Sequence, residues 1–133
     1  MKITPERSSM TYALIFYARL GGAAGCDTPF DVYKRIEGAA PTKSLALDTW
    51  AVYECLRMLD MNGCCEEIRA LREIYFLPFS RDLDMRINRR MITELVCRFA
   101  ADNYLDERTV YRRLHKARRL WLRIRESAER REL

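Results

Sequence analysis

The chain has 133 residues, of which 49% are hydrophobic and 32% charged, and its formal net charge is +5. This length and apolar content fit one domain with an ordinary hydrophobic core. A net charge this small does not by itself indicate nucleic acid, so the distribution of the charges along the chain is more informative than their total.

The first predicted helix runs from Met10 to Leu20, with Ser9 as its cap, after a loose leader of residues 1–9. Its residues are apolar almost all round, so the helix must be buried or covered by a partner. Arg19 interrupts the apolar run, which is far too short to cross a bilayer. We therefore expect neither a secretory segment nor a membrane partner.

A glycine-rich loop follows and contains Gly21, Gly22 and Gly25. No strand is predicted before these glycines and no Lys-Ser or Lys-Thr pair closes the glycine-rich loop, which favours a hinge over a phosphate-binding loop. Thr28 and Pro29 then supply a cap and a first-turn proline for a short helix with the sequence FDVYKRIEG.

The next helix is predicted from about Leu45 to Met61, opened by Pro41 and Ser44 and ended by Asn62-Gly63. One apolar stripe of this helix consists of Thr49, Val52, Leu56 and Leu59. The aromatic residues Trp50 and Tyr53 lie off that stripe. Packing against the N-terminal helices is favoured for this pair over a stacking platform for bases.

A fourth helix, Cys65–Leu77, is predicted to end at Pro78. The loop Pro78–Asn88 that follows is long for a helical bundle, and loops of this length usually move or bind something. Its charged residues are Arg81, Asp82, Asp84 and Arg86. A catalytic pair of carboxylates is disfavoured here, because both aspartates lie in a polar loop with basic neighbours.

The stretch from Phe99 to Arg118 predicts the second half of a helix-turn-helix running into its recognition helix. The first helix of this motif is expected over Arg89–Ala101, and residues 102–104 make the turn. Asp106 then caps a helix that runs to about Arg130, because its side chain can accept a bond from the free amides of the first turn.

Two features around the turn support this motif, and one departs from it. Leu105 and Val110 are placed to form a hydrophobic staple across the cap, and small Ala100 lies where the two helices must approach closely. The position that usually carries glycine falls near Asn103 and Tyr104. Of these two residues only asparagine adopts the left-handed backbone easily.

The predicted recognition helix has an apolar face and a basic face, as a helix in a major groove requires. The apolar stripe consists of Val110, Leu114, Ala117 and Trp121. The residues predicted to contact DNA are Arg108, Thr109, Tyr111, Arg112, His115, Lys116 and Arg119. The alternative is an ordinary basic amphipathic helix with a solvated face. Beyond Trp121 the helix has mixed charge and little apolar content, so this tail is expected to project from the body.

Between Asp106 and Arg125 the chain carries eight basic and only two acidic residues, an excess larger than the net charge of the whole protein. Such a stripe is an electrostatic footprint for a polyanion.

The five cysteines are odd in number and contain no C-x-x-C pair, which predicts reduced and mostly buried thiols. Cys64-Cys65 with Cys97 and the single His115 are the best metal candidate. Adjacent cysteines chelate poorly, so zinc is disfavoured and no metal or other cofactor is predicted. One histidine, scattered acids and no nucleophile spaced beside a base also argue against an enzyme.

Several of these stretches match a known family. The matching features are Asp48, Trp50-Ala51-Val52, Leu56-Arg57-Met58-Leu59, Ile74-Tyr75, Thr109-Val110, Arg113-Leu114 and Lys116-Ala117. On these residues the region from about Lys43 to Ile124 resembles the late-gene antitermination (Q) proteins of lambdoid phages of the phage 21 type. The order of the helices is also similar to the region-four DNA-binding helices of sigma factors.

The resemblance implies a non-enzymatic phage transcription antitermination factor in the cytoplasm of a bacterial host cell. Such a factor binds double-stranded DNA near a late promoter, loads onto paused RNA polymerase and modifies the RNA-exit channel so that terminators are read through. Sigma factor and nascent RNA are further partners that it suggests, and a homo-oligomer on DNA is left open. The residues assigned to polymerase or RNA contact are Arg123, Arg125, Arg81 and Arg86.

Two other functions fit the same sequence. One is a helix-turn-helix repressor or activator of phage or plasmid origin, and the other is a helical protein-interaction inhibitor whose basic face binds an acidic protein surface. For the fold we predict an all-α compact helical bundle. Residues 1–42 form an N-terminal helical segment, and residues 43–133 form the helix-turn-helix domain with a long basic C-terminal helix, all packed as one compact domain.

Overall fold

A computed structural model describes residues 5–78 and 89–132 of the chain. Within these residues every regular element is a helix and no strand occurs, so the predicted all-α class is confirmed. The elements are α1 (Pro5–Arg19), α2 (Pro29–Ala39), α3 (Lys43–Met61), α4 (Cys65–Leu71), the π-helical turn η1 (Arg72–Phe76), α5 (Arg89–Asp102) and α6 (Glu107–Glu132). The predicted binding loop lies outside the described residues apart from Pro78, and so do its Arg81, Asp82, Asp84 and Arg86.

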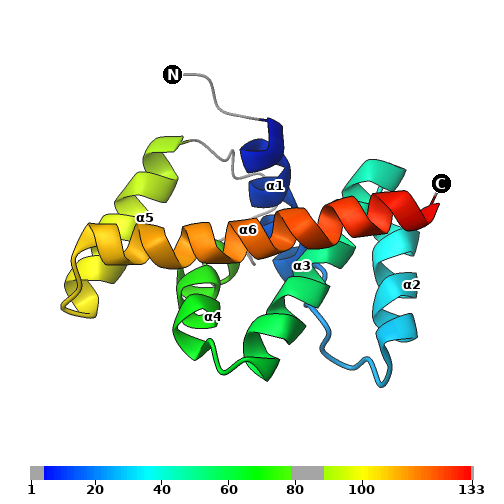
Figure 1. Ribbon diagram of the computed structural model, residues 1–133, viewed down its shortest axis with the longest axis horizontal. Helices are drawn as coiled ribbons and strands as arrows, with labels where there is room; N and C mark the ends of the chain where they lie inside the picture. Colours follow the sequence, from blue (N-terminus) through cyan, green and yellow to red (C-terminus); the bar gives the residue numbers. More distant parts are fainter. Residues whose placement is uncertain (1–4, 79–88, 133) are drawn as a thin grey trace.

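The long helix α6 crosses the whole molecule (Figure 1). It passes α5 near its own beginning, then α4, and packs along α3 in its second half. Helix α1 lies behind α6 and packs against α3 and η1, while α2 packs against the first half of α3. One hydrophobic cluster joins α1, α3, α4, η1, α5 and α6, and Trp121 of α6 is the largest side chain buried in it.

The helix ends follow local capping chemistry. Thr28 and Asp31 form a reciprocal capping box at the start of α2, each side chain accepting from the other's backbone N–H at 3.2 Å. Helix α3 begins two residues earlier than predicted because Thr42, rather than Ser44, is its cap and accepts from Leu45 N at 3.1 Å. Gly63, with φ of 72°, reverses the chain after α3 as expected.

Helix α1 begins earlier than the sequence suggested and buries its own apolar residues. It starts at Pro5, a residue suited to a first helical turn because it lacks a backbone N–H, so Ser9 lies inside the helix and is not its cap. The buried residues of α1 are Met10, Ala13, Leu14, Ile15 and Tyr17. The bundle itself therefore covers most of this apolar helix.

The predicted single helix Cys65–Leu77 is divided into α4 and the π-helical turn η1. The bond from Leu77 N to Arg72 O, at 2.9 Å, spans five residues and marks the wider turn. Leu71 of α4 and the consecutive residues Ile74 and Tyr75 of η1 are all buried in the core. Residue periodicity did not reveal this turn, because a π turn still places apolar residues at nearly helical spacing.

The C-terminal half of α6 does not project from the body as predicted. Leu122 and Ile124 pack against the core, and the indole N–H of Trp121 donates to the backbone oxygen of Asp48 on α3 at 2.9 Å. The Asp48 carboxylate forms an ion pair with Arg125. We call Asp48, Trp121 and Arg125 the α3–α6 clamp. Two apolar residues and one buried ion pair thus hold a tail that looked solvated by composition.

None of the helices within residues 5–78 and 89–132 combines the length and the apolar character that crossing a bilayer needs.

The clamp gives a stability prediction. Asp48→Asn removes the charge that balances Arg125 while keeping the side-chain shape, and both partners are largely buried, with 11% and 15% of their side chains exposed. We expect the free energy of unfolding to fall by about 3 kcal/mol, since removing the Asp48 charge leaves the largely buried Arg125 with only the exposed Glu129, at 3.7 Å, as a charge partner. Urea unfolding followed by circular dichroism measures this loss.

The matched control is Glu54→Gln, which breaks the more exposed pair between Arg57 and Glu54 on the same helix. Exposed pairs contribute little, so we expect a loss below about 1 kcal/mol. Equal losses in the two variants would contradict the assigned role of the clamp.

Candidate nucleic-acid interface

The turn between α5 and α6 is a Schellman-type helix end. Leu105 N donates to Ala100 O at 2.8 Å and Tyr104 N to Ala101 O at 3.3 Å, the two bonds that define this motif. The left-handed position, with φ of 56°, falls on Tyr104. Asn103 instead turns its side chain back and donates from Nδ2 to Phe99 O at 2.8 Å. The turn therefore differs from the geometry that the sequence favoured.

The start of α6 has the predicted cap. Asp106 Oδ1 accepts from Arg108 N at 2.8 Å, which satisfies one of the free amides of the first turn. Val110 is fully buried, and Leu105 packs partly buried against the same core cluster, as expected for a staple. Ala100 is buried where α5 meets the turn. Cap and core together fix the direction in which α6 leaves the turn.

The two faces of α6 are divided as predicted. The apolar stripe Val110, Leu114, Ala117 and Trp121 is buried throughout. On the other face Arg108 and Arg112 are exposed, as are Arg119 and Arg123 further along. These four residues, which we call the arginine strip, form no ion pair among the described residues.

The arginine strip is narrow and long. At 100° per residue its four members fall within a sector of about 60°, and from Arg108 to Arg123 they extend about 22 Å along the helix. Three other predicted contact residues flank it. Tyr111 is 38% exposed, and Thr109 and His115 are half-buried, with His115 Nδ1 lying 3.4 Å from a guanidinium nitrogen of Arg118.

Other basic residues of α6 form contacts inside the molecule. Arg113 pairs with Glu66 at 3.2 Å, and Lys116 pairs with Glu67 at 3.5 Å and lies 3.4 Å from Cys64 Sγ. The hydrogen bond with Cys64, followed by the charge of Glu67, raises the pKa of Lys116. Both pairs join α6 to the first turn of α4. Lys116, predicted to contact DNA, is thus engaged within the protein, although 58% of its side chain stays exposed.

Arg125 is not where the sequence placed it. We predicted a polymerase or RNA contact, but its guanidinium lies against α3 in the clamp and is only 15% exposed. The error arose because its partner Asp48 is far away in the sequence. Arg123 is exposed, as that prediction requires, whereas Arg81 and Arg86 belong to the part of the chain that is not described.

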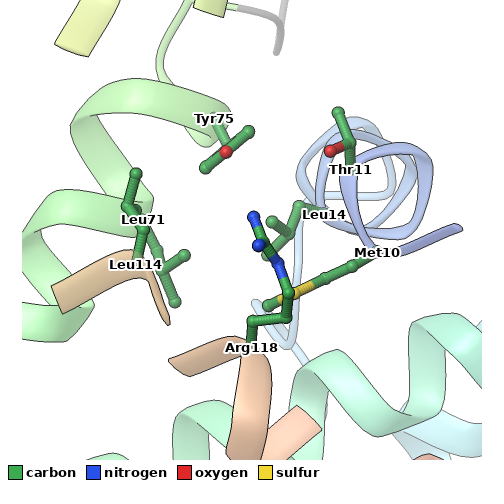
Figure 2. A pocket seen from close by; sticks show the side chains of 7 residues that line it. All are labelled: Met10, Thr11, Leu14, Leu71, Tyr75, Leu114 and Arg118. Carbon is green, nitrogen blue, oxygen red and sulfur yellow. The ribbon is translucent and has the colours of Figure 1, made fainter. Parts of the chain in front are cut away.

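Figure 2 shows a small cavity between α1, α4, η1 and α6. Its volume is about 10 Å³, roughly the space of one water molecule. The cavity is lined by Met10, Thr11, Leu14, Leu71, Tyr75, Leu114 and Arg118. Arg118 extends from α6 between Tyr75 and Leu14, so it points into the bundle and away from the arginine strip. This cavity cannot hold a substrate or an organic cofactor.

The cysteines are less buried than predicted. Only Cys55 is buried, where burial raises its pKa to about 12 and its Sγ lies 3.4 Å from Ala117 O. Cys26 and Cys64 are half-buried, and Cys65 and Cys97 are exposed. In the described part of the chain all five are free thiols, and no three His, Cys, Asp or Glu side chains gather as metal ligands.

Trp50 and Tyr53 contact aromatic neighbours within the fold. The ring of Trp50 lies 5.6 Å from that of Tyr33 on α2, edge to face, and 5.1 Å from that of Tyr53. This is the packing on the N-terminal helices that we favoured over a base-stacking platform. These rings therefore do not enlarge the candidate interface.

Sequence reasoning did not assign a role to Tyr104, which the structure exposes almost completely at the tip of the turn. The cap at Asp106 could have located the left-handed residue. In a turn this short, the Schellman end of the first helix lies only a few residues before the cap of the next helix.

Comparisons of the chain with protein-family models, with curated proteins and with solved structures found no match. The resemblance to antitermination proteins therefore remains a prediction, and the function must be argued from the geometry of the side chains.

The thiols provide a second prediction. Because Cys55 is buried and its raised pKa keeps it protonated, a thiol reagent at pH 8 should modify exposed Cys65 quickly and Cys55 only after unfolding. Cys97 is also exposed but should react more slowly than Cys65, because its hydrogen bond with Glu107 raises its pKa. We expect five thiols in the unfolded protein and no stoichiometric zinc by elemental analysis. Cys55→Ala should remove the slow thiol alone. A bound metal, or native Cys55 as reactive as Cys65, would overturn this prediction.

Proposed function

We propose that the chain binds double-stranded DNA in a sequence-specific manner, with α5 and α6 as the helix-turn-helix and α6 as the recognition helix. The observation that carries this proposal is the arginine strip on one face of α6, opposite a fully buried stripe. Four unpaired guanidinium groups in one row suit a polyanion, and arginine forks also recognise guanine edges.

The length of the arginine strip suggests that its two ends contact different parts of the DNA. A major groove is about 12 Å wide, so the first two turns of α6 are enough to fill it. Arg108 and Arg112, with Tyr111 beside them, are placed for base edges near the helix start. Arg119 and Arg123 lie further along and are suited to phosphates at the border of the groove.

The protein also holds this strip in a fixed position. Glu66 and Glu67 of α4 pair with Arg113 and Lys116 on the side of α6, and the α3–α6 clamp fixes its second half. These contacts are made without the exposed arginines. The strip is therefore preorganised, which lowers the entropy that binding must overcome.

For the biological role we propose transcription antitermination, on the strength of the resemblance between Lys43 and Ile124. In this role the DNA-bound protein transfers to bacterial RNA polymerase. Because α1 is buried in the bundle, it offers no broad apolar surface to polymerase. This helix therefore does not support the transfer to polymerase. Exposed Arg123 is retained as a candidate contact to polymerase or nascent RNA. A DNA-bound repressor or activator is the alternative that shares the same interface.

The DNA proposal is tested by selecting bound duplexes from a random library and measuring affinities by fluorescence anisotropy. Arg108→Ala or Arg112→Ala should cost about 1–3 kcal/mol of discrimination between the selected and a scrambled duplex. Arg119→Ala and Arg123→Ala should weaken binding to both duplexes and lower the salt slope by about 1 each.

Arg57→Ala is the matched control, an exposed arginine on α3 that should leave affinity and slope unchanged. The recognition-helix assignment is wrong if a folded Arg108/Arg112 double alanine variant binds the selected duplex like the wild type. Failure of the wild type to bind any duplex would instead favour the protein-interaction inhibitor.

The antitermination role needs a separate experiment, transcription from a promoter that carries the selected site through a terminator several hundred base pairs downstream. A competitor duplex is added once elongation has begun. Readthrough that persists despite the competitor is the expected result, because the protein then travels with polymerase. Normal termination despite tight promoter binding would reduce the protein to an ordinary DNA-binding regulator.

A further inference from the structure

The turn between α5 and α6 places a tyrosine where a helix end usually has glycine. Tyr104 has φ of 56°, in the left-handed region, and its N–H donates to Ala101 O as the Schellman geometry requires. L-residues with a Cβ adopt this backbone at a cost, and a bulky aromatic residue is an unusual occupant. The backbone at Tyr104 is therefore strained.

The side chain of Tyr104 makes no contact among the described residues that would offset this strain. Tyr104 is 97% exposed, and it has no hydrogen bond, ion pair or ring contact from its side chain among the described residues. The turn is held by other groups, namely the side chain of Asn103 and the backbone of Leu105. An exposed ring in a strained backbone points to a use outside the folded chain.

The position of Tyr104 suggests that use. It lies two residues before the Asp106 cap, and Arg108 follows in the first turn of α6. A recognition helix enters the groove by its N-terminal residues, so the turn before it meets the wall of the groove, where one strand of sugar and phosphate runs. Tyr104 is thus at the edge of the surface that the arginine strip defines.

We propose that Tyr104 is a DNA-backbone contact, with its ring packed on a deoxyribose and its hydroxyl donating to a phosphate oxygen; this rests on the proposed DNA binding. The neutral phenol is suited to this place. Exposed carboxylates flank it at Asp102 and Asp106, and short charged groups of this sign repel phosphates. The tyrosine side chain is longer than either aspartate and is 97% exposed, so it can contact the strand while the carboxylates remain further from it.

The experiment uses three variants of the full chain and the duplex selected by the wild type. Tyr104→Gly removes the ring and also relieves the backbone, Tyr104→Phe removes only the hydroxyl, and Tyr12→Ala removes another exposed tyrosine, from α1. Melting temperature, affinity and the salt dependence of affinity are measured for each variant.

Tyr104→Gly should raise the melting temperature by a few degrees while raising the Kd about tenfold, equal to about 1.4 kcal/mol. The loss should be the same on selected and scrambled duplexes, and the salt slope should not change because tyrosine is neutral. Tyr104→Phe should give a smaller loss, and Tyr12→Ala none. A gain in stability with a loss of binding is a result that a structural role cannot produce.

Three outcomes overturn the inference while leaving the proposed DNA binding intact. They are an unchanged Kd for Tyr104→Gly, a loss of affinity that accompanies a lower melting temperature, and a loss seen only on duplexes with an unpaired base. The last outcome would make Tyr104 a base-stacking residue. If the wild type binds no duplex at all, the proposed function itself fails and takes this inference with it.

Discussion

The packing of α6 on α3 is the interaction on which the rest of the structure depends. Trp121 is the largest buried side chain, and its N–H satisfies the backbone oxygen of Asp48, whose carboxylate in turn neutralises Arg125. A buried charge requires an opposite charge close by, which Asp48 supplies to Arg125, although Arg125 Nη1 has no hydrogen-bond partner among the described residues. Helices α1 and α4 pack around the contact between α3 and α6, and the turn joins α5 to α6.

The packing of α6 against α3 and α4 also decides which of its basic residues remain available to a partner. The helix carries basic residues on nearly all sides, yet those facing α3 and α4 meet Asp48, Glu66 and Glu67. Among the residues that the structure describes, the exposed arginines of α6 without such partners include the arginine strip, on the side away from the bundle. The electrostatic surface is thus shaped by acids on α3 and α4, and a count of basic residues in α6 overstates it.

The sequence was informative where the determining contacts are local. The cap at Asp106, the buried stripe ending at Trp121 and the helix start at Pro29 each depend on neighbours within one or two helical turns. The docked tail, with Arg125 against Asp48, was not predictable, because its partners are distant in sequence and the segment looks polar by composition. The π turn at η1 was missed for another reason: its apolar residues keep nearly helical spacing, so periodicity does not reveal the wider turn. The left-handed Tyr104 was missed although its Schellman bonds are local, because tyrosine is an unusual residue at that position.

Helix α6 is continuous from the arginine strip to the clamp, and this continuity links binding to folding. The same helix contributes Val110, Leu114 and Trp121 to the core and carries the exposed basic face, so one element serves both folding and binding. A ligand held by Arg108 would therefore stabilise the folded protein as a whole. Loosening of the clamp, whose Arg125 lies 17 residues after Arg108, reduces the fraction of molecules competent to bind, even though no ligand-contacting side chain has changed.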